Sequence, residues 1–237
     1  MFKLNSRVRY SEVDQKGNLT IVALINYLQD CSSFESDALS LGLNFVSEHG
    51  WGWFITNWEI HIHSLPKYGD NIVVSTWPVS INGVLCNRDF CIDDEQGNRL
   101  VEAKSLWILM DLKQRRPVRM PEDMKKAYQG SEGLAGQWQG RRIALFKDEQ
   151  EVEGRTIQVM PVHLDTNMHM NNAYYIEIAR DILPKDKKIF QIRTEYKKSA
   201  ELSDEIHIFI STHEDLTQVV LRDDTGRVYA IIEFMTD

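Results

Sequence analysis

Apolar side chains predict one long helix near the start of the chain. Between residues 21 and 41 they recur at intervals of three and four, as on one face of an amphipathic helix. The residues of this face are Ile21, Leu24, Ile25, Leu28, Phe34, Ala38 and Leu41. Gly42 follows the last of them, and we expect the helix to end there.

Four runs that are typical of β-strands follow this helix. They alternate in polarity or are rich in β-branched and aromatic side chains. The predicted strands are residues 53–63, 71–79, 85–92 and 100–111. Turn-forming residues lie between them, at 66–70 and at 93–98. The first half therefore predicts one helix followed by antiparallel strands.

The second half repeats this order. Asp165 stands 151 residues after Asp14, between an extended entry at 158–163 and a helical pattern from Ala173 to Ala179. The strands predicted after it are residues 190–197, 206–211, 217–222 and 228–235. Such an order predicts an α+β fold of two modules, each with a long helix packed against an antiparallel sheet.

The two modules are expected at residues 1–125 and 151–237. A linker at residues 126–150 joins them, in a region that is locally basic and rich in glycine. The 237 residues are therefore read as two small modules and not as one large domain.

The charge of the chain excludes one class of function. Its 27 Lys and Arg residues stand against 35 Asp and Glu residues, for a net charge of −8. General nucleic-acid binding needs a basic footprint, so none is expected. Three scattered cysteines form no disulfide framework. The start of the chain lacks an apolar signal core, and no run is long enough for a membrane span, which predicts a cytoplasmic protein.

No metal or cofactor is expected. His61 and His63 alternate on one predicted strand and so share a face, which makes a metal pair conceivable. Two histidines without a nearby third ligand are a weak metal site. Surface or partly buried histidines are the simpler interpretation.

The densest polar cluster lies just before the second helix. Its strongly polar residues are His163, Asp165, Asn167, His169 and Asn171. In an extended chain a period of two puts them all on one face, so a carboxylate, a carboxamide and an imidazole point the same way. Asn171 or Asn172 can cap the helix, whose N-terminal amides favour negative charge. Such a geometry suits an oxyanion.

A plainer interpretation is that this is a polar turn whose Asp and Asn only cap a helix. The first half argues against it. There, Lys16 and Asn18 stand in place of Asn167 and His169, although that helix needs a cap as well. The second copy thus contains more than capping requires.

With this motif the sequence resembles the acyl-acyl-carrier-protein (acyl-ACP) thioesterases of plastids and bacteria, which are built as a tandem hotdog. The resemblance covers nearly the whole chain and rests on Asp165-x-Asn167-x-His169-x-Asn171-Asn172 with Tyr175. Segments of the first half that share it are Asn26–Asp30, Tyr68–Asp70, Thr76-Trp77, Asn87–Phe90, Ala103–Trp107, Arg115–Pro117 and Pro121-Glu122. It implies a double hotdog that releases free fatty acid from acyl-ACP in fatty acid biosynthesis.

By this resemblance the catalytic residues are Asp165, Asn167 and His169, with an acidic residue on the following strand. Aligning on the turn at Asp204 puts Glu201 in that place, and this is the assignment we favour. Aligning on Glu195-Tyr196 would put Ser199 and Ala200 there instead.

A cysteine nucleophile is not expected. Plant members carry a cysteine directly after the glutamate, whereas this chain has Leu202 there. Glu201 or His169 is then the general base toward a water, and the sequence does not choose between them. Asn167 binds the carbonyl oxygen or positions the water. Asp165 orients a neighbour, either the His169 tautomer or the Asn167 rotamer.

The resemblance also implies residues that bind the substrate. The helix amides near Asn171 and Asn172 polarise the thioester carbonyl. The basic residues Arg115 and Arg116 are candidates for docking the acidic carrier or its phosphopantetheine phosphate. The acyl pocket of the first module is expected to use Leu24, Leu28, Trp53, Ile55 and Trp58.

Other functions remain alternatives. An acyl-coenzyme A thioesterase is the nearest rival, and the basic residues do not discriminate because both carriers are anionic. A non-catalytic acyl-binding hotdog is a rival of another class, but a binder needs no set such as Asp165, Asn167, His169 and Glu201. A dehydratase pattern is not apparent. Both a monomer and a homodimer fit the sequence.

Overall fold

The structure is a computed structural model that describes residues 1–128, 130–136, 138–146 and 151–237. The chain forms two compact units, one made of Met1–Ile55 with Ile62–Gln137 and the other of Thr56–His61 with Trp138–Asp237. Of the predicted linker, residues 129, 137 and 147–150 lie outside the described residues. The predicted module boundaries stay a prediction.

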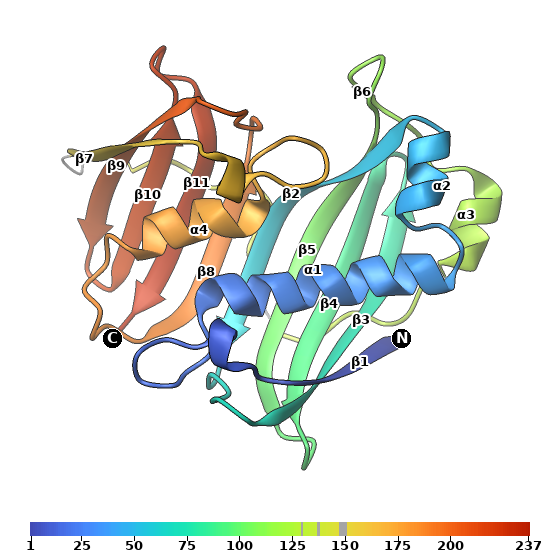
Figure 1. Cartoon of the computed structure of the whole chain (residues 1–237), viewed down its shortest axis with the longest axis horizontal. Coiled ribbons are helices and arrows are strands. Elements are labelled where there is room, and N and C mark those ends of the chain that lie inside the picture. The colour runs from blue at the N-terminus through green and yellow to red at the C-terminus, as the bar shows by residue number, and fades with distance from the viewer. Residues whose placement is uncertain (129, 137, 147–150) are drawn as a thin grey trace. The chain divides into compact units, whose positions relative to one another are not determined.

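The first unit is an antiparallel sheet with one long helix on it (Figure 1). Its strands, in the order in which they pair, are β1 (Phe2–Arg7), β3 (Asn71–Asn82), β4 (Leu85–Asp94) and β5 (Arg99–Asp111). The flanks of β2 (Trp51–Ile62) also belong to it, and the short β6 (Arg116–Pro117) pairs with β5. Its helices are a 3₁₀ turn at Tyr10–Glu12, α1 (Ile21–Ala38), α2 (Leu43–Glu48) and α3 (Glu122–Ala127). The strands predicted from apolar runs are confirmed, whereas β1, α2 and α3 were not predicted.

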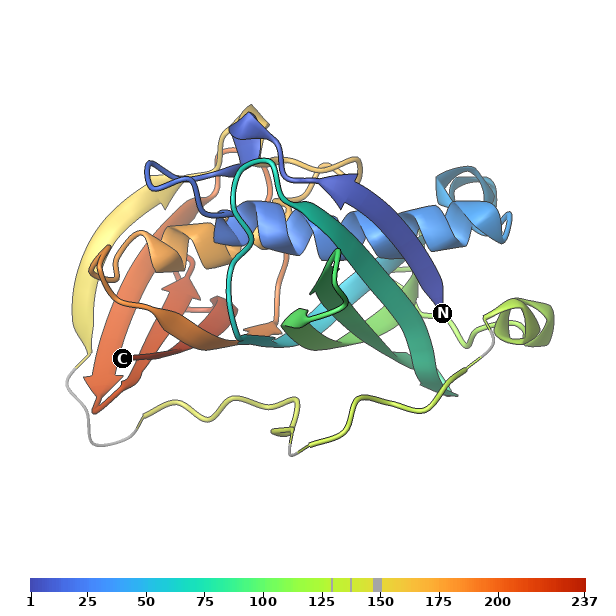
Figure 2. The same cartoon turned by 90° about the horizontal axis from the view of Figure 1, so that it is seen from below.

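Helix α1 forms where the apolar spacing predicted it. The Thr20 hydroxyl caps it by accepting the Ala23 N–H, and its buried face, which includes Leu24 and Leu28, packs against β3 and β1. Figure 2 shows α1 lying on the concave side of this sheet. The expected end at Gly42 is wrong, because the helix ends at Ala38 and Gly42 begins α2.

The second unit repeats this plan on a smaller scale. Its strands, in pairing order, are Thr56–His61 of β2, β8 (Ile189–Tyr196), β11 (Val228–Thr236), β10 (Leu216–Arg222), β9 (Glu205–His213) and β7 (Val152–Gln158). A 3₁₀ turn at Pro161–His163 precedes α4 (Asn172–Arg180), which packs against β11. The expected extended entry at 158–163 is therefore only partly right, since strand β7 ends at Gln158.

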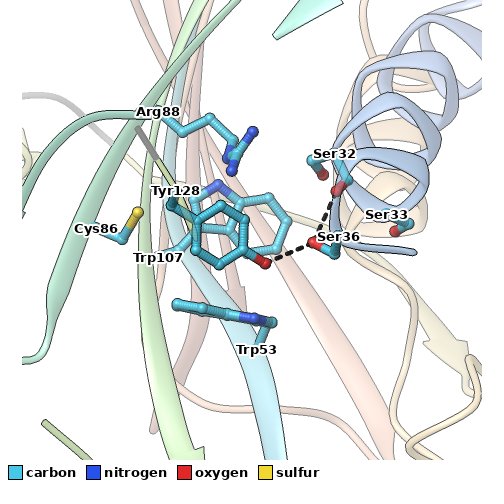
Figure 3. Close-up of a pocket in the computed structure, with 8 residues that line it drawn as sticks. All are labelled: Ser32, Ser33, Ser36, Trp53, Cys86, Arg88, Trp107 and Tyr128. Atoms are coloured by element: carbon cyan, nitrogen blue, oxygen red, sulfur yellow. Dashed lines mark hydrogen bonds between the residues drawn. The ribbon is translucent and has the colours of Figure 1, made fainter. Parts of the chain in front are cut away.

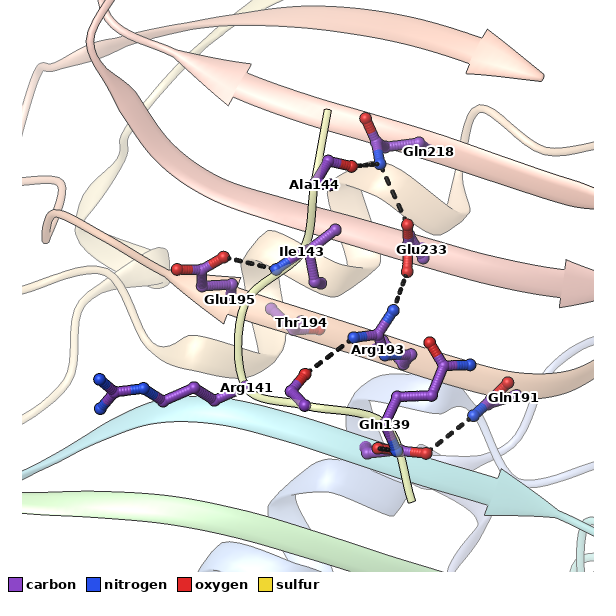
Figure 4. Close-up of polar contacts among 12 residues, drawn as sticks. Gln139, Arg141, Ile143, Ala144, Gln191, Arg193, Thr194, Glu195, Gln218 and Glu233 are labelled. Carbon is purple, nitrogen blue, oxygen red and sulfur yellow. Dashed lines mark hydrogen bonds and ion pairs between the residues drawn. The ribbon is translucent and has the colours of Figure 1, made fainter. Parts of the chain in front are cut away.

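Residues 138–146 lie along this unit's sheet on the side opposite α4 (Figure 2). Side chains of the sheet hold their backbone (Figure 4). Glu59 accepts the Gln139 N–H at 2.8 Å, Glu195 accepts the Ile143 N–H at 2.8 Å, and Gln218 donates to the Ala144 carbonyl at 2.9 Å. Ile143 itself is buried against Val220 and Ile231 of the sheet. This part of the predicted linker is thus a bound segment and not a solvated tether.

Candidate active site

The polar segment before α4 is a tight turn. The Asp165 N–H donates to the His169 carbonyl at 2.8 Å, and the Met168 N–H donates to the Asp165 carbonyl at 3.1 Å. One oxygen of the Asp165 carboxylate accepts the N–H groups of Asn167, at 2.8 Å, and His169, at 3.3 Å. The expectation of an extended segment with its polar residues on one face is wrong. Alternating polar residues also fit a turn in which an aspartate binds its own backbone.

The same turn occurs three more times in the described residues. An aspartate carboxylate accepts the N–H groups two and four residues ahead in Asp14–Asn18, Asp94–Asn98 and Asp223–Arg227. The fourth residue of each copy has a positive φ, and in these three copies it is a glycine with φ of 78°, 84° or 82°. In the candidate site it is Met168, with φ of 61° and a side chain that is 64% exposed. A left-handed conformation costs a non-glycine residue roughly 1 kcal/mol.

The four copies show which residues the turn itself requires. The turn requires the aspartate and a residue that tolerates positive φ. It does not require Asn167 or His169, because other residue types occupy their places in the other copies. Asp165 therefore has an observed structural role in holding the turn backbone.

Glu201 lies opposite His169. The two residues form an isolated antiparallel bridge, and the neighbouring Met170 N–H donates to the Ala200 carbonyl at 2.9 Å. The His169 Nε2 lies 4.0 Å from a Glu201 carboxylate oxygen, and the two side chains are 29% and 66% exposed. The pairing thus follows the alignment on Asp204, which puts Glu201 and not Ser199 in this position.

The first unit has the same bridge with different residues. There Asn18 pairs with Lys67, next to a Leu19 N–H that donates to the Pro66 carbonyl at 2.8 Å. Asn18 thus stands where His169 stands, and Lys67 stands where Glu201 stands. The imidazole and the carboxylate face each other only in the second unit's copy of this bridge.

Asn171 caps α4. Its side-chain oxygen accepts the Ala173 N–H at 2.9 Å, and its carbonyl accepts the Tyr174 N–H at 3.0 Å. The carbonyl of Asn172 accepts the hydroxyl of Tyr196 at 2.9 Å. The carboxamide-bearing Asn167 is exposed in the turn. The expected cap is confirmed, and the substrate-binding role of Asn171 and Asn172 stays a prediction.

A separate cavity of about 70 Å³ lies in the first unit (Figure 3). Its lining comes from α1, β2, β4, β5 and the end of α3, and comprises Ser32, Ser33, Ser36, Trp53, Cys86, Arg88, Trp107 and Tyr128. Trp53 meets the Tyr128 ring edge to face at 6.3 Å, and the Tyr128 hydroxyl bonds with Ser36 at 2.8 Å. Aromatic walls with a few polar groups are typical of ligand pockets.

A buried ion pair forms part of this cavity wall. The Arg88 guanidinium pairs with Glu35, donates to the Thr76 hydroxyl at 3.0 Å and lies 5.6 Å from the Tyr128 ring centre. Arg88 is 5% exposed and Glu35 is 8% exposed. Neither residue is among the predicted site residues. Glu35 carried a usable signal, since it follows Leu28 and Cys31 at helical spacing on the buried face of α1.

Two family models match almost the whole chain. The acyl-ACP thioesterase N-terminal domain matches residues 1–128, and the acyl-ACP thioesterase C-terminal domain matches residues 146–234. The chain belongs to the acyl-ACP thioesterase family. The resemblance stated from its motifs is confirmed.

The chain shares low sequence identity with curated members of the family. The chloroplastic acyl-ACP hydrolase FATB2 of Cuphea viscosissima is 22% identical over 219 residues, which are 84% of this chain and 52% of that protein. The chloroplastic palmitoyl-acyl carrier protein thioesterase of Arabidopsis thaliana is 23% identical over 214 residues, again 84% and 52%. The chain spans about half the length of the curated relatives it matches.

Solved structures share the fold of this thioesterase-family chain. An acyl-ACP thioesterase from Bacteroides thetaiotaomicron superposes with a TM-score of 0.88 at 22% identity, covering 99% of this chain and 97% of that one. The 12:0-ACP thioesterase from Umbellularia californica gives a TM-score of 0.85 at 19% identity, covering 100% and 96%. The predicted α+β double hotdog is confirmed.

The remaining predicted site residues of this acyl-ACP thioesterase family member lie in the cavity wall, at an exposed hairpin or among the buried residues. Trp53 lines the cavity of the first unit, and Arg115 and Arg116 are exposed at the β5–β6 hairpin. Four others are buried at 5% exposure or less: Leu24, Leu28, Ile55 and Trp58. Their roles toward substrate stay predictions.

The two histidines considered as a metal pair have carboxylate neighbours. His61 Nε2 lies 3.2 Å from Glu59 and its ring stacks on Trp138, while His63 lies 3.6 Å from Glu102. Within the described part of the chain, no group of three histidine, cysteine or acidic residues could hold a metal ion. No helix there has both the length and the hydropathy that crossing a bilayer requires.

The cysteines of this thioesterase-family chain are buried free thiols. Burial raises the pKa of Cys31 to about 12 and the pKa of Cys86 and Cys91 to about 11. Since thiolates are the reactive form, these groups are poor nucleophiles near neutral pH.

Proposed function

We propose that the chain hydrolyses the thioester of an acyl-acyl-carrier protein and releases the free fatty acid. Membership of the acyl-ACP thioesterase family supports this function. Relatives of about twice the length, such as FATB2 of Cuphea viscosissima, are named as acyl-ACP hydrolases. The acyl carrier protein, with its phosphopantetheine-linked acyl chain, is the partner that this proposal names.

One observation carries the catalytic part of the proposal. The bridge between His169 and Glu201 repeats, in the second unit, a bridge that the first unit closes with Asn18 and Lys67. Because the fold forms this bridge with either pair, stability does not demand an imidazole beside a carboxylate. A pair that can accept and return a proton is what thioester hydrolysis uses.

The proposed reaction needs one water. Its oxygen bonds to the thioester carbonyl carbon, its proton passes to His169 or Glu201, and the carbon–sulfur bond then breaks. The proton is returned to the departing thiolate, which leaves as the phosphopantetheine thiol. In this proposal Asn167 donates to the carbonyl oxygen or positions the water. Asp165 supports Asn167 and His169 by holding the turn that carries these two residues.

Purified protein tests this proposal directly. We expect free acid to be released from acyl-ACP thioesters of varied chain length, and acyl-coenzyme A thioesters of the same lengths serve as the comparison. His169→Ala and Glu201→Gln should each lower kcat by roughly 10²–10⁴-fold. The matched controls Asn18→Ala and Lys67→Gln change the same bridge in the first unit and should leave kcat unchanged. Full activity in both second-unit variants would refute the assignment.

We also propose that the cavity of the first unit takes the acyl chain. Three of its eight lining residues are aromatic, and one of these, Trp53, is a predicted acyl-chain residue. Trp53→Ala should enlarge the cavity and shift the preference toward longer acyl chains in the same panel. An unchanged preference would exclude Trp53 from this role. We also propose that the protein is located in the cytoplasm, and cell fractionation tests this location.

A further inference from the structure

Two buried tyrosines reach the turn that carries Glu201. Tyr175, on α4, accepts the N–H of Ala200 with its hydroxyl oxygen at 2.8 Å. Tyr229, on β11, donates its hydroxyl to the Asp204 carboxylate at 2.8 Å, and the same carboxylate oxygen accepts the Glu201 N–H at 3.0 Å. Both tyrosines are 2% exposed. Tyr175 thus binds the backbone just before Glu201, and Tyr229 binds the Asp204 carboxylate that accepts the Glu201 N–H.

The first unit builds the corresponding turn without a hydroxyl at the Tyr175 position. Its Lys67 N–H donates to the Asp70 carboxylate at 2.8 Å, as Glu201 donates to Asp204. Pro66 stands where Ala200 stands and has no N–H to satisfy. The residue of α1 that corresponds to Tyr175 is Leu24.

The Tyr229 position also carries a leucine in the first unit. The Leu100 carbonyl accepts the N–H groups of His63 and Ser64, at 3.0 and 3.2 Å. The Tyr229 carbonyl accepts those of the two residues after Tyr196, at 2.8 and 3.2 Å, in the same pattern. Leu100 thus stands where Tyr229 stands. The first unit closes this turn with a leucine at each position, but there Pro66 has no N–H to satisfy, whereas Tyr175 satisfies the buried N–H of Ala200 in the second unit.

We propose that Tyr175 and Tyr229 are positioning residues that hold Glu201 beside His169. This inference rests on the proposed hydrolase function. The Glu201 side chain is 66% exposed and has little packing to fix it, so its direction depends on its backbone. A reacting group that moves by about 1 Å can lose roughly 10²-fold in rate.

Phenylalanine variants test the two hydroxyls, since they keep each ring and remove only its oxygen. We expect Tyr175→Phe and Tyr229→Phe each to lower kcat about tenfold and to change KM less than about twofold, because positioning of a reacting group acts on the transition state. Tyr27→Phe is the matched control. Tyr27 is a 4% exposed tyrosine of α1 that donates to Glu12 at 2.7 Å in the first unit, and its variant should keep kcat.

A double-mutant cycle separates positioning from a general structural role. In the Glu201→Gln background, the two phenylalanine substitutions should have no further effect on kcat, because the group that they position is already lost. A merely structural role would lower kcat by the same factor in both backgrounds, and that result would overturn the inference. Thermal unfolding of each variant ensures that all assays are run well below its midpoint.

Amide hydrogen exchange gives a readout that needs no activity. Exchange of the Ala200 and Glu201 amides should quicken at least about tenfold in Tyr175→Phe and Tyr229→Phe and stay unchanged in Tyr27→Phe. Wild-type kcat in both phenylalanine variants, with Glu201→Gln inactive, would overturn the inference and leave the function intact. An inactive wild-type enzyme would overturn the function, and unchanged exchange would then overturn the positioning as well.

Discussion

Replacing Glu35 by alanine should strongly destabilise the first unit, because it leaves the Arg88 guanidinium buried without its carboxylate. The pair lies in the cavity wall, where Arg88 is 5% exposed and Glu35 is 8% exposed. A charge in such a place cannot regain the water that it lost on folding. The variant therefore loses more than a surface ion pair would.

The size of the loss follows from the partners that Arg88 keeps. Removing one partner of a buried pair costs roughly 3–5 kcal/mol. Arg88 retains the Thr76 hydroxyl at 3.0 Å and the Tyr128 ring at 5.6 Å, which favours the lower end, about 3 kcal/mol. In a chain of this size such a loss lowers Tm by roughly 6–12 °C.

Calorimetry and urea unfolding measure this effect, and two further variants control it. The double variant Glu35→Leu with Arg88→Met removes both charges and should unfold close to the wild type or above it. Glu122→Ala removes the carboxylate of an ion pair with Lys125 whose Glu122 side chain is 77% exposed, and this variant should unfold close to the wild type. A double variant less stable than Glu35→Ala would refute the reasoning.

Three other predictions concern the turn, the docking surface and the thiols. Asp165→Asn should keep most of kcat, because an amide oxygen can also accept the two turn N–H groups, and a loss as large as that of His169→Ala would instead show a need for charge. Reversing Arg115 and Arg116 to glutamate should raise KM for acyl-ACP about tenfold at low ionic strength and less at high salt, and an unchanged KM would remove them from docking. Burial raises the pKa of Cys91 to about 11 from 9.0, so the unfolded chain loses this proton first as pH rises. Stability should therefore fall between pH 9.0 and about 11, and Cys91→Ala should flatten that fall in urea titrations at each pH.

The repeated fold could be predicted because its helices and strands follow from the spacing of apolar residues over short stretches of sequence. Apolar residues three and four apart predict α1, and Leu24 and Leu28 of that pattern are indeed buried. The strands were found for the same reason, since alternation and β-branched side chains act over a few residues. β1 and β7 were missed, because mostly exposed strands such as β7 carry no continuous apolar run.

The candidate site was found in sequence but given the wrong local shape. A period of two in polar residues is shared by an extended strand and by a turn in which Asp165 binds its own backbone. Only the backbone conformation, with a positive φ at Met168, tells them apart. The pairing of His169 with Glu201 joins residues that are distant in the chain, and the turn at Asp204 was the only local feature that fixed its register.

The buried polar contacts could not be predicted, since each depends on two distant residues. Nothing near Arg88 in the sequence indicates that Glu35 of another element neutralises it. The docking of residues 138–146 on the second sheet is similar, because Gly140, Arg141 and Arg142 are also residues that a solvated linker would contain. What holds it is a set of sheet side chains that accept or donate to its backbone, such as Glu195 and Gln218.

The two units together distinguish what the fold requires from what the chemistry requires. Both close the same turn with an aspartate and bridge it to the same neighbouring segment, so those features belong to the architecture. Among the differences around that bridge, His169, Glu201, Tyr175 and Tyr229 replace Asn18, Lys67, Leu24 and Leu100. His169 and Glu201 face each other. Tyr175 binds the backbone just before Glu201, and Tyr229 binds the Asp204 carboxylate that accepts the Glu201 N–H. These four differences gather around one carboxylate, and their grouping supports chemistry in the second unit by an argument that does not use the family.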